Sequence, residues 1–408
     1  MPPFREFVAL IALMMGLTAL SIDNLLPAFP AIQDAYDIPD ANELQLLVYV
    51  YMFGFGIVQL VYGPISDVVG RRPTLLAGLA IYAVGCVMAA LAPSFEFLLV
   101  ARAVQGVGVA AARVLAVAIV RDCYSGREMA RVMSLTFAVF IIVPVFAPAT
   151  GSATLLLGDW HLLFTTMLAL AVVVAAWFWL RMPETLHPEY RLPLSAKRIA
   201  EGVRLTVTNR AAIGYSTAVG LMFGALMGYV GSSQQIFETE VYGLGPYFPV
   251  AFGAIAAVMG VAAVVNSQLV RSLGMRRLSH ASILAFLVVS IIQVALAAAY
   301  AGRPPLLLFG LVLAASHFLA SLTFPNFNAM AMEPLGAVAG TASSFMGFYT
   351  TLVGALFGLA IGQAFDGTVL PLGIGYLVLS ILAVAVVLWT EKGRLFQPQH
   401  EPAAAQRR

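Results

Sequence analysis

Twelve long apolar runs constrain the fold of this chain more than any other feature of its sequence. A helix needs about 20 mostly apolar residues to cross the ~30 Å hydrocarbon core of a bilayer. The runs lack the alternating pattern of a barrel strand, and helices are the other structure that satisfies every backbone group in lipid. We therefore predict an all-α membrane protein with twelve transmembrane helices. The predicted spans are 7–30, 45–66, 73–92, 97–120, 132–155, 161–180, 211–233, 247–270, 279–300, 306–331, 341–365 and 370–389.

The composition supports this class and excludes several others. Of 408 residues, 61% are apolar and 10% are charged, whereas about a quarter of the residues are charged in an average soluble domain. The first run is too long for a signal-peptide core and has no A-x-A-like cleavage site, so we expect it to remain as a span. The two cysteines, Cys86 and Cys123, cannot form a disulfide framework or a CxxC site. We expect no metal, no other cofactor and no nucleic-acid partner.

The basic residues predict the orientation of the helices. If the N-terminus lies in the cytoplasm, 19 of the 22 Lys and Arg residues fall in cytoplasmic segments. Arg102 and Arg113 then lie inside the fourth span, and Arg303 alone faces outward. Positive charge on the cytoplasmic side is the usual determinant of membrane topology. We predict a multi-pass protein of the bacterial inner membrane with both termini in the cytoplasm.

The longest polar stretch divides the chain near its middle. Residues 181–210 carry three prolines followed by a basic segment with amphipathic character, which indicates a cytoplasmic linker. The domains predicted on either side are two six-helix bundles, 1–180 and 211–390. A tail at 391–408 mixes Pro, Gln and Ala and is expected to be disordered.

A short internal repeat agrees with this division. Gly70-Arg-Arg after the second span recurs as Gly274-Met-Arg-Arg after the eighth, at an offset of 204 residues, which is half of 408. Many transporters place their binding site near the middle of the membrane, between two such repeats.

Four sequence motifs add a family resemblance to these observations. They are Gly63-Pro-Ile-Ser-Asp67-Val-Val-Gly70-Arg71-Arg72-Pro73 after the second span, Arg102-x-x-Gln105-Gly106-x-Gly108 in the fourth, Asp23-x-x-x-Pro27-x-x-Pro30 in the first and Ala147-Pro148-x-x-Gly151 in the fifth. The first motif resembles the signature loop of the major facilitator superfamily, and the set resembles the drug:proton antiporters of the Bcr/CflA type. The fifth-span motif is reduced, because the fuller antiporter pattern has further glycines where this chain has Ser152 and the Val143/Pro144 pair.

The resemblance covers nearly the whole chain, from the first span to the twelfth. It implies the major facilitator fold, with two pseudo-symmetric six-helix bundles around a central cavity lined by spans 1, 4, 7 and 10. It also implies a secondary active transporter that exchanges protons for a small-molecule substrate and works in the lipid bilayer as a monomer.

The signature loop implies a conformational latch. Its expected members are Gly63, Asp67, Gly70, Arg71, Arg72 and Arg121. Asp67 lies near the carbonyl end of a helix, which disfavours an anion, so it needs a compensating partner. Family precedent places this acid against the N-terminus of the eleventh helix, near 340–344, with Arg121 beside it. The alternative is a folding and topology signal, in which the glycines form a tight turn and the arginines stay on the cytoplasmic side.

Asp23 is the only acid well within any predicted span. An ionised side chain in mid-membrane costs at least ~3 kcal/mol, so such residues face a cavity, pair with another group or titrate. The residue 204 positions later is Met227, so the repeat did not copy the acid. We interpret Asp23 as a proton-coupling residue. The alternative is a cap near the outer end of the first helix, because Pro30 follows only seven residues later.

Arg102 is the predicted partner of Asp23. It lies five residues from the outer end of the fourth span, at a depth comparable to that of the acid. An ion pair would favour the carboxylate and burial would favour the neutral acid, and a proton site needs the two effects near balance. Arg113 follows eleven residues later on the same helix face, and it either lines the cavity or extends to the inner interface.

The other candidate site residues are polar or helix-bending groups within the spans. His317 is a third proton-coupling candidate because histidine titrates near neutral pH, and the alternative is a hydrogen-bonded core histidine. The residues expected at the substrate cavity are Gln105, Arg113, Pro148, Gly151 and Asn326. Asn326, Asn328 and the run from Ser232 to Gln235 contact substrate or, alternatively, join helices by hydrogen bonds.

Two transport functions and one other class are open on this basis. The leading hypothesis is proton-coupled efflux of small hydrophobic compounds, such as antibiotics, by alternating access. The second keeps the fold and moves one specific metabolite, by uptake or export. A membrane enzyme fits poorly, because the sequence offers no metal cluster and no nucleophile with a convincing base.

Overall fold

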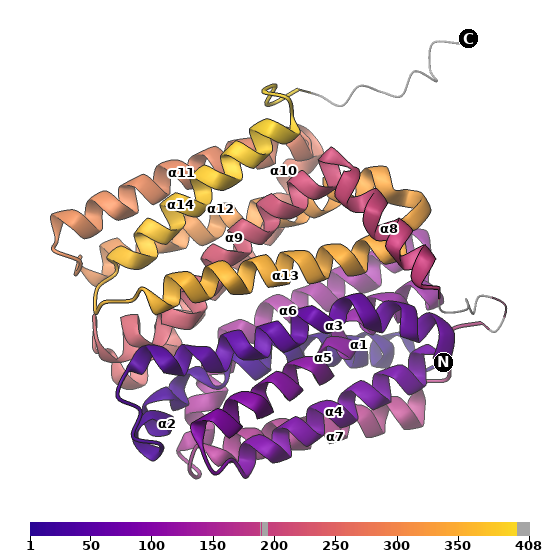
Figure 1. The fold of residues 1–408 in the computed structure, drawn as a ribbon, viewed down its shortest axis with the longest axis horizontal. Helices are drawn as coiled ribbons and strands as arrows, with labels where there is room; N and C mark the ends of the chain where they lie inside the picture. Colours follow the sequence, from indigo (N-terminus) through magenta and orange to yellow (C-terminus); the bar gives the residue numbers. More distant parts are fainter. Residues whose placement is uncertain (188, 190–194, 398–408) are drawn as a thin grey trace.

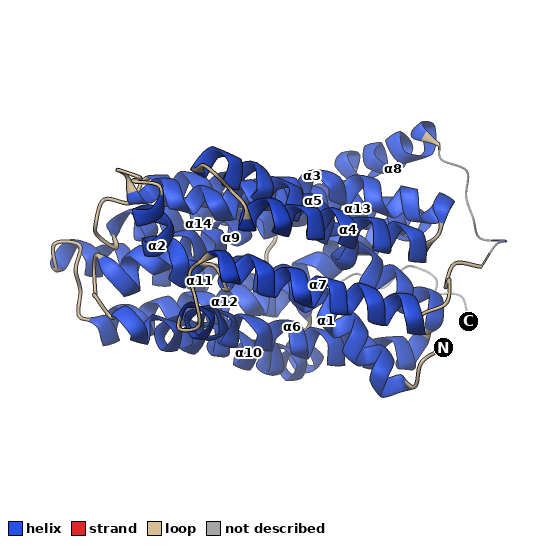
Figure 2. Cartoon of the chain, turned by 90° about the horizontal axis from the view of Figure 1, so that it is seen from below, coloured by secondary structure: helices blue, strands red, loops and turns tan. Residues whose placement is uncertain are grey.

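Helices dominate the structure, as the sequence predicts. The computed structural model describes residues 1–187, 189 and 195–397, and this part of the chain contains no strand. The long helices lie side by side along one direction (Figures 1 and 2). The helices are α1 (Phe4–Asp23), α2 (Phe29–Ala35), α3 (Leu46–Val69), α4 (Arg71–Ala90), α5 (Phe95–Cys123), α6 (Gly126–Leu155), α7 (His161–Arg181), α8 (Ala196–Thr208), α9 (Arg210–Gln234), α10 (Phe248–Leu273), α11 (Met275–Ala299), α12 (Leu306–Met332), α13 (Ala339–Gln363) and α14 (Leu370–Thr390).

The predicted spans correspond to these helices. Eleven helical segments of the described chain are long and apolar enough to cross a membrane, and α6 adds the shorter apolar stretch Ile142–Leu155. Helices α1 and α2 share the first span, and α8 lies in the predicted linker. The prediction of an all-α multi-pass membrane protein is thus confirmed.

The first span is broken rather than continuous. Helix α1 ends at Asp23, the 3-10 turn η1 (Leu26–Ala28) follows, and α2 then begins at Phe29. Pro27 has no backbone N–H, so the carbonyl of Asp23 loses the hydrogen-bond partner that a continuous helix would supply. Pro27 of the first-span motif therefore places Asp23 at a helix end inside the span.

The two halves of the chain form two bundles that meet along their long helices. Helix α3 packs against α13, and α6 packs against α10, and Figure 1 shows α13 lying beside α3 at the boundary of the two colour ranges. A Cβ atom on Gly253 of α10 would lie 2.7 Å from the carbonyl oxygen of Val145 in α6. Helix α1 begins, and helix α14 ends, at the same end of the molecule (Figure 1). We call this end the terminal end.

The predicted linker and tail are described in part. Helix α8 lies at the terminal end. Its Gly202 packs closely against Thr341 of α13, and a Cβ atom added at Gly202 would lie 2.8 Å from that side chain. The carboxylate of Glu391, at the start of the predicted tail, is 3.2 Å from the guanidinium of Arg276. The predicted disorder concerns mainly 398–408, and these positions, with 188 and 190–194, lie outside the described residues.

Candidate substrate and proton site

Asp23 lies at the break between α1 and α2, near the interface of the two bundles. Its side chain is 6% exposed, and within the described chain no ion pair or side-chain hydrogen bond neutralises it. It lies within electrostatic reach of Tyr51 in α3 and of Tyr229 in α9, which belongs to the other bundle. The hydroxyl of Tyr229 is itself buried and has no hydrogen-bond partner in the described structure. A buried acid and a buried phenol with unused hydrogen-bonding capacity thus lie near each other across the bundle interface.

The predicted ion pair between Asp23 and Arg102 is wrong for this structure. Arg102 is completely buried, and its guanidinium donates to the carbonyls of Leu47 at 3.0 Å and Ser21 at 2.9 Å. It also lies over the ring of Tyr51, 4.5 Å from the ring centroid. Arginine has five donors in a fixed fork, so backbone carbonyls and an aromatic face satisfy it without a carboxylate.

The helix break supplies one of these carbonyls. In a continuous helix the carbonyl of Ser21 would accept from the N–H of Leu25, but that N–H bonds to Ile22 at 3.3 Å instead. Arg102 takes the vacated position, and a cation at the C-terminal end of a helix also interacts favourably with the helix dipole. Arg102 therefore stabilises the break that positions Asp23.

Gln105 is held by hydrogen bonds within the first bundle, and its predicted place at the substrate cavity stays a prediction. It is completely buried in the first bundle, where its carbonyl oxygen accepts from Arg102 at 2.7 Å and its amide nitrogen is 3.1 Å from the sulfur of Cys86. Both ends of the amide are thus used within the bundle. The glycines of the same motif serve packing, because a Cβ on Gly106 would overlap the backbone of Tyr51 in α3.

The fifth-span motif supports the same break. Gly151 of α6 admits the carbonyl of Asn24, since a Cβ at Gly151 would overlap it. Thr150 donates to the side-chain oxygen of Asn24 at 3.0 Å, and Pro148 is buried one turn away. These residues hold the segment after Asp23 in place, and their predicted contact with substrate stays a prediction.

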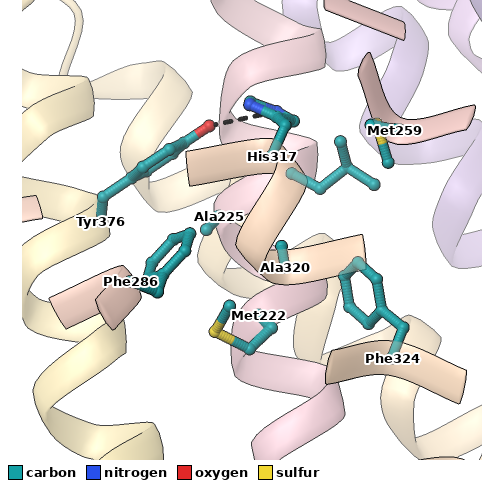
Figure 3. Close-up of a pocket in the computed structure, with 9 residues that line it drawn as sticks. Met222, Ala225, Met259, Phe286, His317, Ala320, Phe324 and Tyr376 are labelled. Atoms are coloured by element: carbon teal, nitrogen blue, oxygen red, sulfur yellow. Dashed lines mark hydrogen bonds between the residues drawn. The ribbon is translucent and has the colours of Figure 1, made fainter. Parts of the chain in front are cut away.

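His317 lies inside the second bundle, on α12. Its Nδ1 is 2.9 Å from the carbonyl of Leu313 and its Nε2 is 3.5 Å from the hydroxyl of Tyr376. Figure 3 shows both rings beside a small cavity lined by Phe286 and by methionines. The cavity measures about 10 Å³, which is room for one water molecule. The ring of Tyr229 meets His317 edge-on at a centroid distance of 4.6 Å, so this histidine packs against the same tyrosine that lies near Asp23.

The two remaining cavity candidates differ in their surroundings. Asn326 is buried and donates to the side chain of Asn266 at 2.8 Å and to the carbonyl of Leu322 at 2.8 Å. It therefore joins α12 to α10, which is the alternative given for it above. Arg113 is partly buried in α5, and its predicted place at the cavity stays a prediction.

The signature loop forms an ion-pair network at the terminal end. Arg71 lies 2.5 Å from Asp67 and 2.9 Å from Asp122. Gly70 has a φ of 116°, a conformation that favours glycine, and it brings the carboxylate of Glu184 to the backbone N–H of Arg71 at 2.9 Å. The network ties α3, α4 and α5 to the segment after α7.

Two predicted details of the latch need correction. The cationic partner of Asp67 is Arg71 rather than Arg121, which is exposed and takes part in no ion pair of the described chain. Arg72 bonds to α7, where it donates to the carbonyl of Trp179 at 2.6 Å. The signature loop contacts the eleventh span, α13, at Gly63. A Cβ atom added at Gly63 would lie 2.7 Å from the hydroxyl of Ser344 in α13.

Asp67→Asn tests the latch directly. Asp67 lies one turn beyond Gly63 on the same face of α3, and the predicted latch sets its carboxylate against the N-terminus of α13, where a helix favours an anion. We expect the substitution to speed maleimide labelling of Ser344→Cys in a variant lacking Cys86 and Cys123. The exposed acid Glu128 provides the matched control as Glu128→Gln. Equal labelling of both variants, with lower abundance of Asp67→Asn alone, would support the topology-signal alternative.

At the opposite end, a cluster of amides joins the two bundles. Gln45 donates to Gln235 at 2.5 Å, Gln235 donates to the side chain of Asn42 at 2.7 Å, and Gln363 donates to the carbonyl of Asn42 at 2.7 Å. One turn further in, the hydroxyl of Tyr49 donates to the carbonyl of Gly358 at 2.8 Å. Asn42, Gln45 and Gln363 were not predicted as functional, although amides at the ends of apolar spans are a usable signal. The cluster closes this end of the bundle interface.

Gln235→Ala is expected to open this closed end. The substitution removes two of the hydrogen bonds between bundles, each contributing about 1 kcal/mol, which corresponds to at least a tenfold rise in the open population. The readout is the maleimide labelling rate of Met227→Cys, just inside the cluster, in the same cysteine-free background. Gln33→Ala is the control, because Gln33 bonds to Ile38 within the first bundle. Labelling that rises equally in both variants would show that the amide cluster does not hold the end closed.

Two bundles of membrane helices with a buried, unpaired acid at their interface are an arrangement typical of secondary transporters. The sequence profile of the Major Facilitator Superfamily matches residues 11–359. The chain belongs to this family, and the resemblance noted from its motifs is confirmed.

Relatives of similar length agree with this assignment. The chain is 30% identical to "Uncharacterized MFS-type transporter YdgK" of Bacillus subtilis (strain 168), covering 97% of this chain and 98% of that protein. It is 28% identical to "Bicyclomycin resistance protein homolog" of Haemophilus influenzae, covering 90% and 91%. It is 29% identical to "Multidrug resistance protein MdtL" of Klebsiella pneumoniae (strain 342), covering 94% and 95%.

Solved structures share the fold. The human organic anion transporter MFSD10 superposes with a TM-score of 0.71 at 18% identity, covering 96% of this chain and all of that one. A D-xylose-proton symporter superposes with a TM-score of 0.72 at 13% identity, covering 95% and 99%. At these identities the likeness establishes the fold alone, and the predicted twelve-helix major facilitator architecture is confirmed.

Proposed function

We propose that this protein is a proton-coupled antiporter that exports small hydrophobic compounds, antibiotics among them. The observation that carries the proposal is Asp23, a buried acid without a counter-ion at a proline-induced helix break between the bundles. The names of the relatives, which include a bicyclomycin resistance protein homolog and multidrug resistance proteins, support export of such compounds. The protein moves its substrate without converting it chemically.

The coupling follows from the cost of an ionised carboxylate in a water-poor interface. When Asp23 is neutral, the interface closes around it at little cost. When it is ionised, it needs water or a hydrogen-bond donor, and the unused hydroxyl of Tyr229 across the interface is a candidate donor. Protonation therefore biases which arrangement of the bundles is favoured, and proton release to one side links that bias to substrate movement.

The proposed orientation places the terminal end in the cytoplasm of a bacterium, in the inner membrane. The distribution of 19 of 22 basic residues supports it. The two bundles, 1–180 and 211–390, then rock about their interface as a monomer, with 181–210 as a linker on the cytoplasmic side. The amide cluster of Asn42, Gln45, Gln235 and Gln363 faces the periplasm, and the signature loop faces the cytoplasm.

Proteoliposomes with an imposed pH gradient and a lumenal pH dye test the function. A panel of hydrophobic antibiotics, with polar metabolites for contrast, is added one compound at a time. We expect one or more of the hydrophobic compounds to dissipate the gradient while moving against the proton flux. A response to one polar metabolite alone would favour the specific-metabolite alternative, and movement in the same direction as protons would establish symport.

A further inference from the structure

A groove on the lipid-facing side of the first bundle is open and apolar. It lies between α4 and α7, has a volume of about 330 Å³, and its lining includes Leu76, Ala80 and Ala83 of α4 with Ala175, Ala176 and Trp179 of α7. Alanines at these positions leave the space that larger side chains would fill. The residues 76, 80 and 83 share one helix face, as do 172, 175, 176 and 179. The groove therefore follows the helix axes, perpendicular to the membrane plane.

A cationic group lies at the terminal end of this groove. The guanidinium of Arg72 donates from Nη2 to the carbonyl of Trp179 at 2.6 Å, one turn before Leu76. Its Nε atom is buried and has no hydrogen-bond partner in the described structure. The nearby carboxylate of Glu184 accepts backbone N–H groups of Arg71, Arg72 and Leu186 at 2.9, 3.1 and 3.0 Å. Within the described chain no ion pair neutralises the Arg72 side chain.

Trp179 indicates how deep the guanidinium of Arg72 lies in the membrane. Its indole is 58% exposed, and tryptophans of membrane proteins concentrate at the level of the lipid headgroups and ester groups. From Leu76 to Ala83 the groove spans about 10 Å at 1.5 Å per residue, roughly a third of the hydrocarbon core. This length suits the upper part of one acyl chain and is too short for a packed transmembrane helix.

We propose that this groove binds one anionic phospholipid of the leaflet at the terminal end. One acyl chain lies along the alanines between α4 and α7, and the phosphate accepts hydrogen bonds from Arg72. Arginine suits this task because its planar fork binds phosphate oxygens in pairs. The site gives Arg72 of the signature loop a role separate from the latch, and it does not depend on the transported compound. With the proposed orientation, the leaflet is the cytoplasmic one.

Quenching of Trp179 by brominated lipids measures the site. A variant that keeps Trp179 as its only tryptophan (Trp160, Trp177 and Trp389→Phe) is reconstituted into dioleoyl-phosphatidylcholine vesicles. Brominated phosphatidylglycerol or brominated phosphatidylcholine is then titrated in. We expect phosphatidylglycerol to bind about fivefold more tightly than phosphatidylcholine, the factor expected of one arginine acting on an anionic lipid. The Arg72→Gln variant should lower the ratio of the two lipid affinities to about one, and Arg72→Lys should retain part of the preference for phosphatidylglycerol.

Two controls separate a bound lipid from the general lipid annulus. A protein with Trp389 as its only tryptophan, exposed at a similar fraction of 51%, should respond unchanged to Arg72→Gln. Ala176→Leu fills the groove and should reduce quenching of Trp179 by both lipids. A ratio near one in the unmodified site, or a preference that survives Arg72→Gln in a protein that elutes as a normal monodisperse peak, would overturn the proposal. If Arg72→Gln is not folded, Ala176→Leu decides the question, and unchanged quenching of Trp179 in that variant would overturn the proposal.

Discussion

Asp23→Asn is expected to abolish proton-driven transport while leaving expression and membrane insertion intact. The amide has nearly the size of the carboxyl group, and it keeps the helix break because Pro27 is unchanged. It removes the only buried acid at the break, so the interface no longer has a charge that appears and disappears with protonation. The measurement is substrate accumulation or efflux in proteoliposomes under a pH gradient, which should fall to the level of protein-free vesicles.

The same variant gives an internal control for substrate binding. Exchange of labelled for unlabelled substrate, measured without a gradient, needs rocking of the bundles but no net proton movement, so it should persist. Asp34→Asn makes the same chemical change outside the buried interface, in α2, and should transport normally. Uphill transport by Asp23→Asn at the normal rate would end the coupling role of Asp23 and make His317 the next candidate.

The helical class and the spans were predictable because lipid leaves so few structures available. Every backbone group must be satisfied within the span, so a run of about 20 apolar residues has essentially one solution. The break at Asp23 was also within reach, since Pro27 follows the acid by four residues and removes the donor for its carbonyl. The prediction treated 7–30 as one span because hydropathy alone does not register this loss.

Partners of buried polar groups were not predictable in the same way. Spacing placed Arg102 at the depth of Asp23, but an arginine can be satisfied by any well-placed carbonyls, and those of Ser21 and Leu47 depend on how three helices pack. The amide cluster joins Asn42 to Gln235 and Gln363, which are separated by up to 321 residues along the chain. No local pattern connects such positions, so only the fold brings them together.

Arg102→Ala is expected to destabilise the protein strongly, and this effect should appear in folding before it appears in coupling. The substitution leaves the carbonyls of Ser21 and Leu47 and the amide of Gln105 without their donor in a fully buried site. Each unsatisfied group costs about 1–3 kcal/mol, so a total of about 3 kcal/mol or more is expected. Thermal unfolding in detergent, followed by loss of the monodisperse peak, should show a fall of several degrees in Tm.

Arg102→Lys and a double-mutant cycle decide between a structural role and an ion pair formed in another state. Lysine keeps the charge but has a single ammonium, which reaches fewer of the three acceptors, so it should recover only part of the lost stability. If Arg102 acts through the break, Asp23→Asn and Arg102→Ala should affect substrate binding additively, within ~0.5 kcal/mol. A larger coupling energy would mean that the two side chains meet when the bundles rearrange. In that case Arg102 leaves the carbonyl of Ser21 during the transport cycle, and the break in the first span changes with it.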